Sequence, residues 1–186
     1  MVHRRRVLQA ALALAGAATL TAHSPYKQWY AYRAQRLIVV ASASDAEACG
    51  IADAVSVQML AQHPESKAMS AQARSARDVV QMLRTRQLEV AVLDLITATA
   101  AYAGSVPFER EGALALCALA AFPDYLLLSL DDFPEDKAYQ IAQASIELPR
   151  AAQAALRTGR PPDVAAIPFH PGALAFQREH SAQPAR

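Results

Sequence analysis

The stretch LIVVASASD, residues 37–45, decides the fold. Its first five residues form a continuous apolar run rich in β-branched side chains, which is typical of a strand buried on both faces of a parallel sheet. The polar residues that follow predict a turn, and either Ser44 or Asp45 can cap the next helix. We expect that helix from about Ala46 to Gln62, because apolar residues recur along one face and Pro64 follows.

Strands and helices continue to alternate downstream of this unit. The expected elements are a weaker strand over 67–73, a helix opened by the capping box from Ser75 to Asp78, a strand over 88–93 and a short helix over 96–103. Asp94 lies at the carboxyl end of the third strand, and Gly104 suits the end of the short helix. This order predicts an α/β domain built on a single, doubly wound, mostly parallel sheet.

The carboxyl-terminal half is less regular. Two apolar runs, 114–121 and 125–130, are expected to form adjacent antiparallel strands. A long helix should begin near Glu135 and run to about Leu156, with an interruption at Pro149 as the alternative. The remaining expectations are a turn over 167–172, a last helix over 173–179 and a disordered tail over 180–186.

The amino terminus resembles an export signal. Arg4 and Arg5 belong to a basic cluster that precedes an alanine-rich apolar run, and RRRVLQ (4–9) resembles the twin-arginine consensus R-R-x-F-L-K. We expect residues 1–24 to be a signal peptide or a retained membrane anchor, and these two alternatives stay open. Residues 25–36 alternate aromatic and basic side chains, as juxtamembrane segments do. The chain is therefore expected in the periplasm, either released or held at the inner membrane.

Composition limits the partners of the remaining chain. About 150–160 residues follow the leader, enough for one domain with a real core, expected over 37–179. The net charge is +1 and the basic residues are scattered, which makes nucleic acid a poor partner. Cys49 and Cys117 are the only cysteines, and their spacing does not decide whether they pair.

Three stretches together resemble the TAXI class of TRAP-transporter solute receptors, which are two-lobed periplasmic binding proteins. Residues 77–104 resemble the family's helix, strand and helix closing in A-Y-N-G, and residues 133–141 its Y-P-E-x-x-x-Y-x-I helix entry. The run IPFHPGALAFQRE (167–179) resembles the closing I-P-L-H-P-G-A-x-x-Y-Y-x-E, and its motif residues are Pro168, His170, Pro171 and Gly172. The resemblance implies a periplasmic-binding-protein-like lobe, a small carboxylate ligand and a TRAP permease or another membrane protein as partner.

The departures from the family matter equally. Residues 126–130 lead almost directly into the long helix, so the second lobe is missing, and one lobe offers only an open half-site. The expected rim of this half-site lies at the carboxyl ends of the strands and consists of Ser42, Ser44, Gly50 and Asp94. Asp45 and Glu47 place negative charge there and would oppose an anionic solute.

Other chemistry has little support in the sequence. His170 lies between prolines without a nucleophile nearby, Ser129 and Ser44 lack a nucleophile elbow, and Cys49 is either a core residue or a thiol of lowered pKa. The acidic residues around 131–136 lack the spacing of a calcium loop. We therefore expect a binding protein and not an enzyme, without metal or cofactor. The alternative is a degenerate membrane-anchored interaction module that binds a protein partner or self-associates.

Overall fold

A computed structural model of the chain describes residues 35–148 and 167–181. The expected signal or anchor over 1–24 lies outside the described residues, as do most of the juxtamembrane segment and the tail beyond Ser181. Within the described ranges, no helix combines the length and the apolar character that a membrane span requires.

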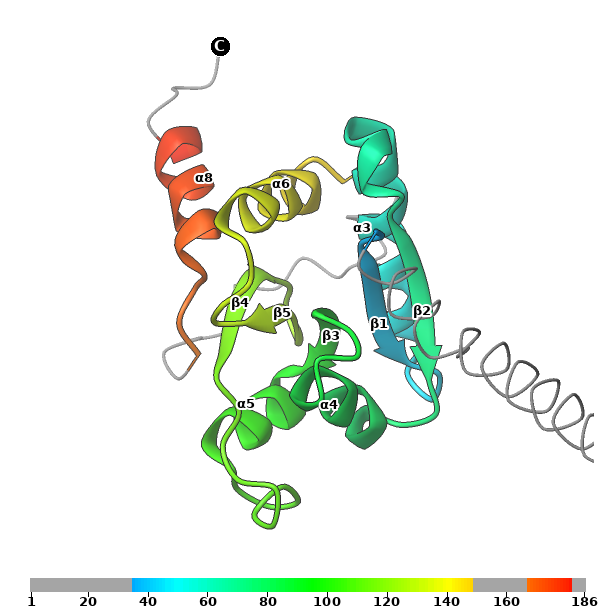
Figure 1. The fold of residues 1–186 in the computed structure, drawn as a ribbon, viewed down its shortest axis with the longest axis vertical. Coiled ribbons are helices and arrows are strands. Elements are labelled where there is room, and N and C mark those ends of the chain that lie inside the picture. Colours follow the sequence, from blue (N-terminus) through cyan, green and yellow to red (C-terminus); the bar gives the residue numbers. More distant parts are fainter. Residues whose placement is uncertain (1–34, 149–166, 182–186) are drawn as a thin grey trace, which may run out of the picture. The chain divides into compact units, whose positions relative to one another are not determined.

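The domain is built on one mixed sheet of five strands in the order β2-β1-β3-β5-β4 (Figure 1). The strands are β1 (Ile38–Ser42), β2 (Met69–Ala73), β3 (Val90–Asp94), β4 (Leu116–Ala121) and β5 (Tyr125–Leu130). β1 pairs in parallel with β2 and β3, whereas β5 runs antiparallel to both β3 and β4. The predicted α/β class, the single sheet and the antiparallel pair at its end are confirmed. The sheet is mixed and not mostly parallel as expected, because β5 pairs antiparallel with both of its neighbours.

Helices cover both faces of the sheet. They are α3 (Ala46–Gln62), α4 (Ala76–Arg84), α5 (Leu95–Ala103), α6 (Glu135–Ile146) and α8 (Pro171–Ser181), with a short 3₁₀ turn, η1 (Pro64–Ser66), after α3. The core on one face joins the sheet to α3 and α6, and the core on the other joins it to α4 and α5. α8 packs on the outer side of α6 through Phe176, Tyr139 and neighbouring alanines.

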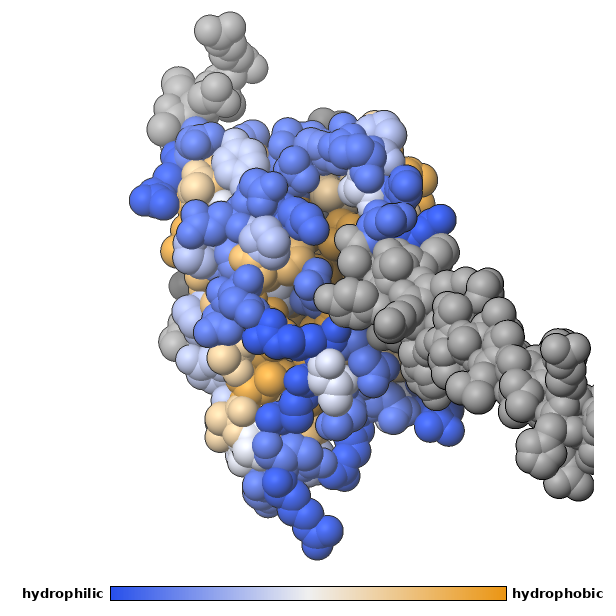
Figure 2. Space-filling view, viewed as in Figure 1, coloured by the Kyte–Doolittle hydropathy of each residue, from blue (hydrophilic) through white to orange (hydrophobic). Residues whose placement is uncertain are grey.

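Each central strand supplies both cores, because successive side chains of a strand point to opposite faces. Val39 packs on the α3 side and Val40 on the α4 side, and both are fully buried. This two-sided burial explains why β1 and β3 are apolar up to their last residues, Ser42 and Asp94. Hydrophilic residues cover much of the face seen in Figure 2, with smaller apolar areas between them.

The helix boundaries follow local capping chemistry. Asp45, and not Ser44, caps α3 by accepting a hydrogen bond from the Ala48 amide at 3.0 Å. Ser75 caps α4 in the same way through the Asp78 amide, and Gly104 ends α5 with a φ of 62°. Because an alanine Cβ at Gly104 would lie 2.4 Å from the Ala113 amide nitrogen, this left-handed position also needs glycine for space.

The boundaries of two helices differ from the main expectation. α6 ends at Ile146 and Leu148 is no longer helical, which agrees with the alternative of an interruption at Pro149. The bias of a residue before proline against the helical region explains this end. Residues 149–156, over which the helix was expected to continue, lie outside the described residues. α8 begins at Pro171, a favoured first helical residue, and extends to Ser181, so the tail prediction is wrong for residues 180 and 181. His180 stacks on Phe176 there, with ring centroids 5.1 Å apart.

Candidate functional site

The predicted rim lies at the edge of the sheet where β1, β2, β3 and β4 end. β5 starts at the same edge, because the register places Tyr125 opposite Asp94. The β4–β5 turn also lies at this edge, where the Leu95 amide donates to the Asp124 carbonyl at 2.9 Å. We call this region the carboxyl edge, and define it by Ser42, Ser44, Asp45, Glu47, Asp94, Asp124 and Tyr125.

Two serines of the predicted rim contact each other. The hydroxyls of Ser42 and Ser44 are 2.8 Å apart in a hydrogen bond whose donor can be either group. Ser42 is buried and Ser44 is exposed, so the pair connects the interior with solvent. The Ser42 carbonyl accepts from the Asp45 amide and from the Cys49 thiol, which holds the turn against the start of α3.

Tyr125 joins this group, although sequence reasoning did not single it out. Its hydroxyl donates to Asp45 Oδ1 at 3.0 Å, the same oxygen that accepts from the Ala48 amide. Burial, the hydrogen bond to Asp45 and the negative charges of Asp45, Glu47 and Asp94 raise the pKa of Tyr125 to about 12. The aromatic residue that opens the apolar run 125–130 was the available signal, but its partner depends on a strand register that spacing along the chain does not give.

The other two predicted rim residues take different positions. Asp94 caps α5 by accepting from the Thr97 amide at 2.9 Å, and it lies beside Tyr125 across the β3–β5 pair. Gly50 is exposed on α3, and a Cβ there would meet no heavy atom within 4 Å. No close backbone approach therefore requires glycine at this position, and the geometry gives Gly50 no part in the hydroxyl and carboxylate group.

The carboxyl edge is acidic and accessible. Ser44, Glu47 and Asp124 are exposed, and Ile96 in the first turn of α5 is 83% exposed. Asp45 and Asp94 each use one carboxylate oxygen to cap a helix, and the second oxygen takes no part in the cap. This arrangement can accept hydrogen bonds from hydroxyl or ammonium groups, and it repels a bare carboxylate.

Neither cysteine offers a reactive thiolate. Both thiols are free, so Cys49 and Cys117 are not paired. Burial, followed by the charges of Asp53 and Asp45, raises the pKa of Cys49, which overturns the alternative of a lowered pKa near a helix start. Burial and Asp131 likewise raise the pKa of Cys117.

The motif residues 168–172 lie on the β4 side of the sheet and build the start of α8. The Pro168 carbonyl accepts from the Ala118 amide at 2.8 Å, and the His170 amide donates to the Ala118 carbonyl at 2.9 Å. His170 is buried, its Nδ1 accepts from the Gly172 amide at 3.2 Å, and its ring meets Phe133 edge-on. Pro171 is the first residue of α8. These contacts explain the motif as packing.

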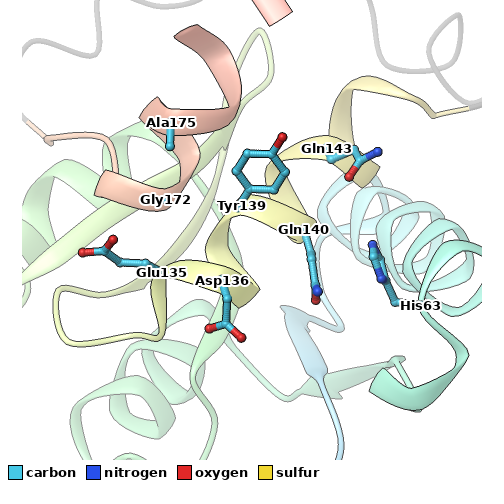
Figure 3. A pocket seen from close by; sticks show the side chains of 8 residues that line it. All are labelled: His63, Glu135, Asp136, Tyr139, Gln140, Gln143, Gly172 and Ala175. Atoms are coloured by element: carbon cyan, nitrogen blue, oxygen red, sulfur yellow. The ribbon is translucent and has the colours of Figure 1, made fainter. Parts of the chain in front are cut away.

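A shallow hollow of about 470 Å³ lies elsewhere, between the end of α3, α6 and α8 (Figure 3). Its lining residues are His63, Glu135, Asp136, Tyr139, Gln140, Gln143, Gly172 and Ala175. Glu135 points away from His63 in the close view, so the polar groups do not converge on one point. None of the predicted rim residues lines this hollow, and we favour the carboxyl edge because hydroxyls and carboxylates are joined there by direct hydrogen bonds.

In the part of the chain that the structure describes, no three His, Cys, Asp or Glu side chains are grouped so that they could hold a metal ion. Comparison with protein families and with curated proteins gives no match for this chain.

Proposed function

We propose that this chain is a solute-receptor-like binding protein of the cell envelope, reduced to one lobe and related to the TAXI receptors of TRAP transporters. The observation that carries the proposal is the accessible group of side chains at the carboxyl edge, where Ser42 contacts Ser44 and Tyr125 contacts Asp45. Open α/β sheets bind ligands at this edge. The proposed relation to the TAXI receptors is based on the resemblance of residues 77–104, 133–141 and 167–179 to that family.

The missing lobe fits the strand connections. β4 and β5 are joined by the short turn at 122–124, and β5 leads through residues 131–134 into α6. Residues 131–134, where the resemblance expects the second lobe, are too few to hold one. A solute bound here is therefore enclosed from one side only, and the expected affinity is low.

The charges at the edge bear on the class of solute. The resemblance implies a small carboxylate of the glutamate or 2-oxoacid kind, but Asp45, Glu47 and Asp94 oppose an anionic group. A solute that turns an ammonium or hydroxyl group toward these side chains fits better, with any carboxylate directed to solvent. An amino acid meets both conditions, and we propose this class first.

The localisation and the transport partner belong to the same proposal. The basic and apolar leader, including Arg4 and Arg5, supports export and either release or retention at the inner membrane. A receptor of this kind would hand its solute to a TRAP permease or another membrane protein.

A second function is favoured by the exposure of Ile96, which is 83% exposed beside the acidic carboxyl edge. Isolated exposed apolar residues are ordinary, but one next to a charged rim suits a protein contact. In this alternative the chain is an anchored interaction module, and the carboxyl edge binds a protein in place of a solute.

Isothermal titration of the purified chain with glutamate, 2-oxoglutarate, neutral amino acids and diamines separates these proposals. A receptor gives heat with at least one class, and Asp94→Asn or Ser44→Ala weakens it, while Ser105→Ala on the exposed loop after α5 serves as the control. The absence of heat with every class would contradict the receptor proposal. In the interaction module, Ile96→Asp weakens a protein complex and leaves solute titrations unchanged.

A further inference from the structure

His170 is a buried histidine that caps the start of α8. It precedes Pro171, the first residue of the helix, and it is only 1% exposed. Its carbonyl accepts from the Leu174 amide, and its Nδ1 accepts from the Gly172 amide at 3.2 Å. These two bonds are those of an N-cap residue, a position that serine, threonine, aspartate or asparagine usually fills.

The cap fixes the protonation state of the imidazole. Because Nδ1 accepts a hydrogen bond, it carries no proton, and the neutral ring holds its proton on Nε2. Nε2 is buried and has no hydrogen-bond partner in the part of the chain that the structure describes. A second proton would turn Nδ1 into a donor that points at the Gly172 N–H, so two donors would face each other.

The positive charge of a protonated ring is also unfavourable at this place. The first amides of α8 give this end of the helix a partial positive charge, which repels a cation. Phe133 meets the ring edge-on from the segment before α6, with ring centroids 6.2 Å apart. Since His170 is buried, water does not solvate the added charge.

Ionisable groups on the surrounding elements do not replace the lost cap. Within the described ranges, no hydrogen bond or ion pair joins any of them to the imidazole. Asp132 pairs with Arg86, and Glu179 accepts from the Tyr139 hydroxyl. The groups are the Cys117 thiol on β4, Asp131 and Asp132 before α6, Glu135 and Asp136 in the first turn of α6, and Glu179 in α8.

α8 is fitted closely against α6 at the capped end (Figure 3). A Cβ at Gly172 would lie 2.1 Å from the Glu135 carbonyl oxygen, so the two backbones are already in contact there. Repulsion between Nδ1 and the Gly172 amide is therefore not relieved by a shift of α8 toward α6. The start of α8 has to move away from α6, which separates Phe176 from Tyr139.

We propose that His170 is a pH-sensitive cap, whose protonation breaks the start of α8 and releases this helix from α6. The docked helix requires the neutral ring, whereas the released chain takes up a proton, so docking is favoured at higher pH and lost as the pH falls. Histidine changes its charge between about pH 5 and 8, and we expect the release in this range. This inference stands apart from the solute proposal, because no residue of the carboxyl edge belongs to the α6–α8 contact.

Hydrogen exchange of the purified full chain, followed for each amide by NMR from about pH 8 to about pH 5, tests the proposal. Protection factors correct for the intrinsic effect of pH on exchange, so they report the opening of structure. We expect those of residues 174–178 to fall by up to about tenfold for each pH unit, as one proton is taken up, while those of β1 and β3 stay constant. The ring signal of His170 should titrate over the same pH range.

His170→Asn separates the cap from other effects of acid. Asparagine keeps a side-chain acceptor at the cap and does not titrate, so the protection of α8 should become independent of pH. His180→Asn is the matched control, because it removes the histidine within α8 and should leave the pH dependence as in the wild type.

Several results would overturn the proposal. They are constant α8 protection in the wild type, a fall that persists in His170→Asn, a pH dependence that His180→Asn removes, or a parallel loss of protection in β1 and β3. If His170→Asn does not fold, the wild-type ring signal decides, since a ring that stays neutral while α8 loses protection contradicts a pH-sensitive cap.

Discussion

Replacing Gly172 with alanine tests how α8 is fitted against α6. A Cβ at this position would lie 2.1 Å from the Glu135 carbonyl oxygen, 2.9 Å from its carbon and 3.0 Å from Ala138 Cβ. The first two atoms belong to the backbone at the start of α6, so no side-chain rotation relieves the clash. α8 must move away from α6, and the contact between Phe176 and Tyr139, with ring centroids 5.3 Å apart, is disturbed.

The size of the effect follows from two opposing contributions. Alanine in a helix favours folding by about 0.5–1 kcal/mol over glycine, whereas forcing a methyl group into filled space costs about 1–3 kcal/mol or more. Because rigid backbone lies in the way, we expect Gly172→Ala to lower the free energy of unfolding by about 2 kcal/mol. For a domain of this size that is a fall in melting temperature of roughly 4–8 °C.

Gly50→Ala is the matched control for this substitution. Gly50 is also helical, but a Cβ there meets nothing within 4 Å, so alanine should stabilise the chain by about 0.5–1 kcal/mol. Urea unfolding followed by circular dichroism measures both variants against the wild type. If Gly172→Ala were as stable as Gly50→Ala, the close packing of α8 on α6 would be refuted.

Three further predictions concern the core, the thiols and the carboxyl edge. Leu127→Ala, at a fully buried position of β5, should cost about 2–5 kcal/mol in urea unfolding, and a cost near zero would contradict the two-sided core. With a thiol-specific reagent at neutral pH, Cys49 and Cys117 should both react slowly in the folded chain and quickly in urea, because burial raises both pKa values; fast reaction of the folded chain would contradict this environment. The pKa of Tyr125 rises from 10.0 to about 12 on folding, so its contribution to stability is complete below pH 10 and is lost as the pH rises from 10 toward 12. Tyr125→Phe should remove this part of the alkaline loss of stability, and identical pH profiles for variant and wild type would argue against the Asp45 contact.

Much of the fold could be predicted from local patterns. The apolar runs at 37–41 and 88–93 indicate buried strands because a strand covered on both faces has no polar position. The caps at Asp45, Ser75 and Gly104 are local as well, since each depends on a side chain or a backbone angle within one helical turn.

The unpredicted features depend on contacts between distant residues. Tyr125 meets Asp45 only because the β3–β5 register brings it to the carboxyl edge, and no spacing along the chain shows this pairing. Glycine is needed at position 172 because the backbone of α6 approaches it closely, and the sequence does not show this contact. The motif at 167–179 therefore indicated a family resemblance but not its packing role. Gly50, expected on the rim of the half-site, lies exposed on α3 and takes no part in the hydroxyl and carboxylate group, because the direction of its helix face depends on how α3 packs on the sheet.

Amide mapping by NMR tests most directly whether the carboxyl edge binds a solute. The isotope-labelled chain would be titrated with the amino acid or diamine that gives heat in calorimetry, or with the full panel. We predict shift changes confined to the amides of residues 42–48, 94–97 and 124–125, growing with solute concentration. Changes centred instead on the hollow between α6 and α8, or no change with any member of the panel, would contradict a binding role for the carboxyl edge.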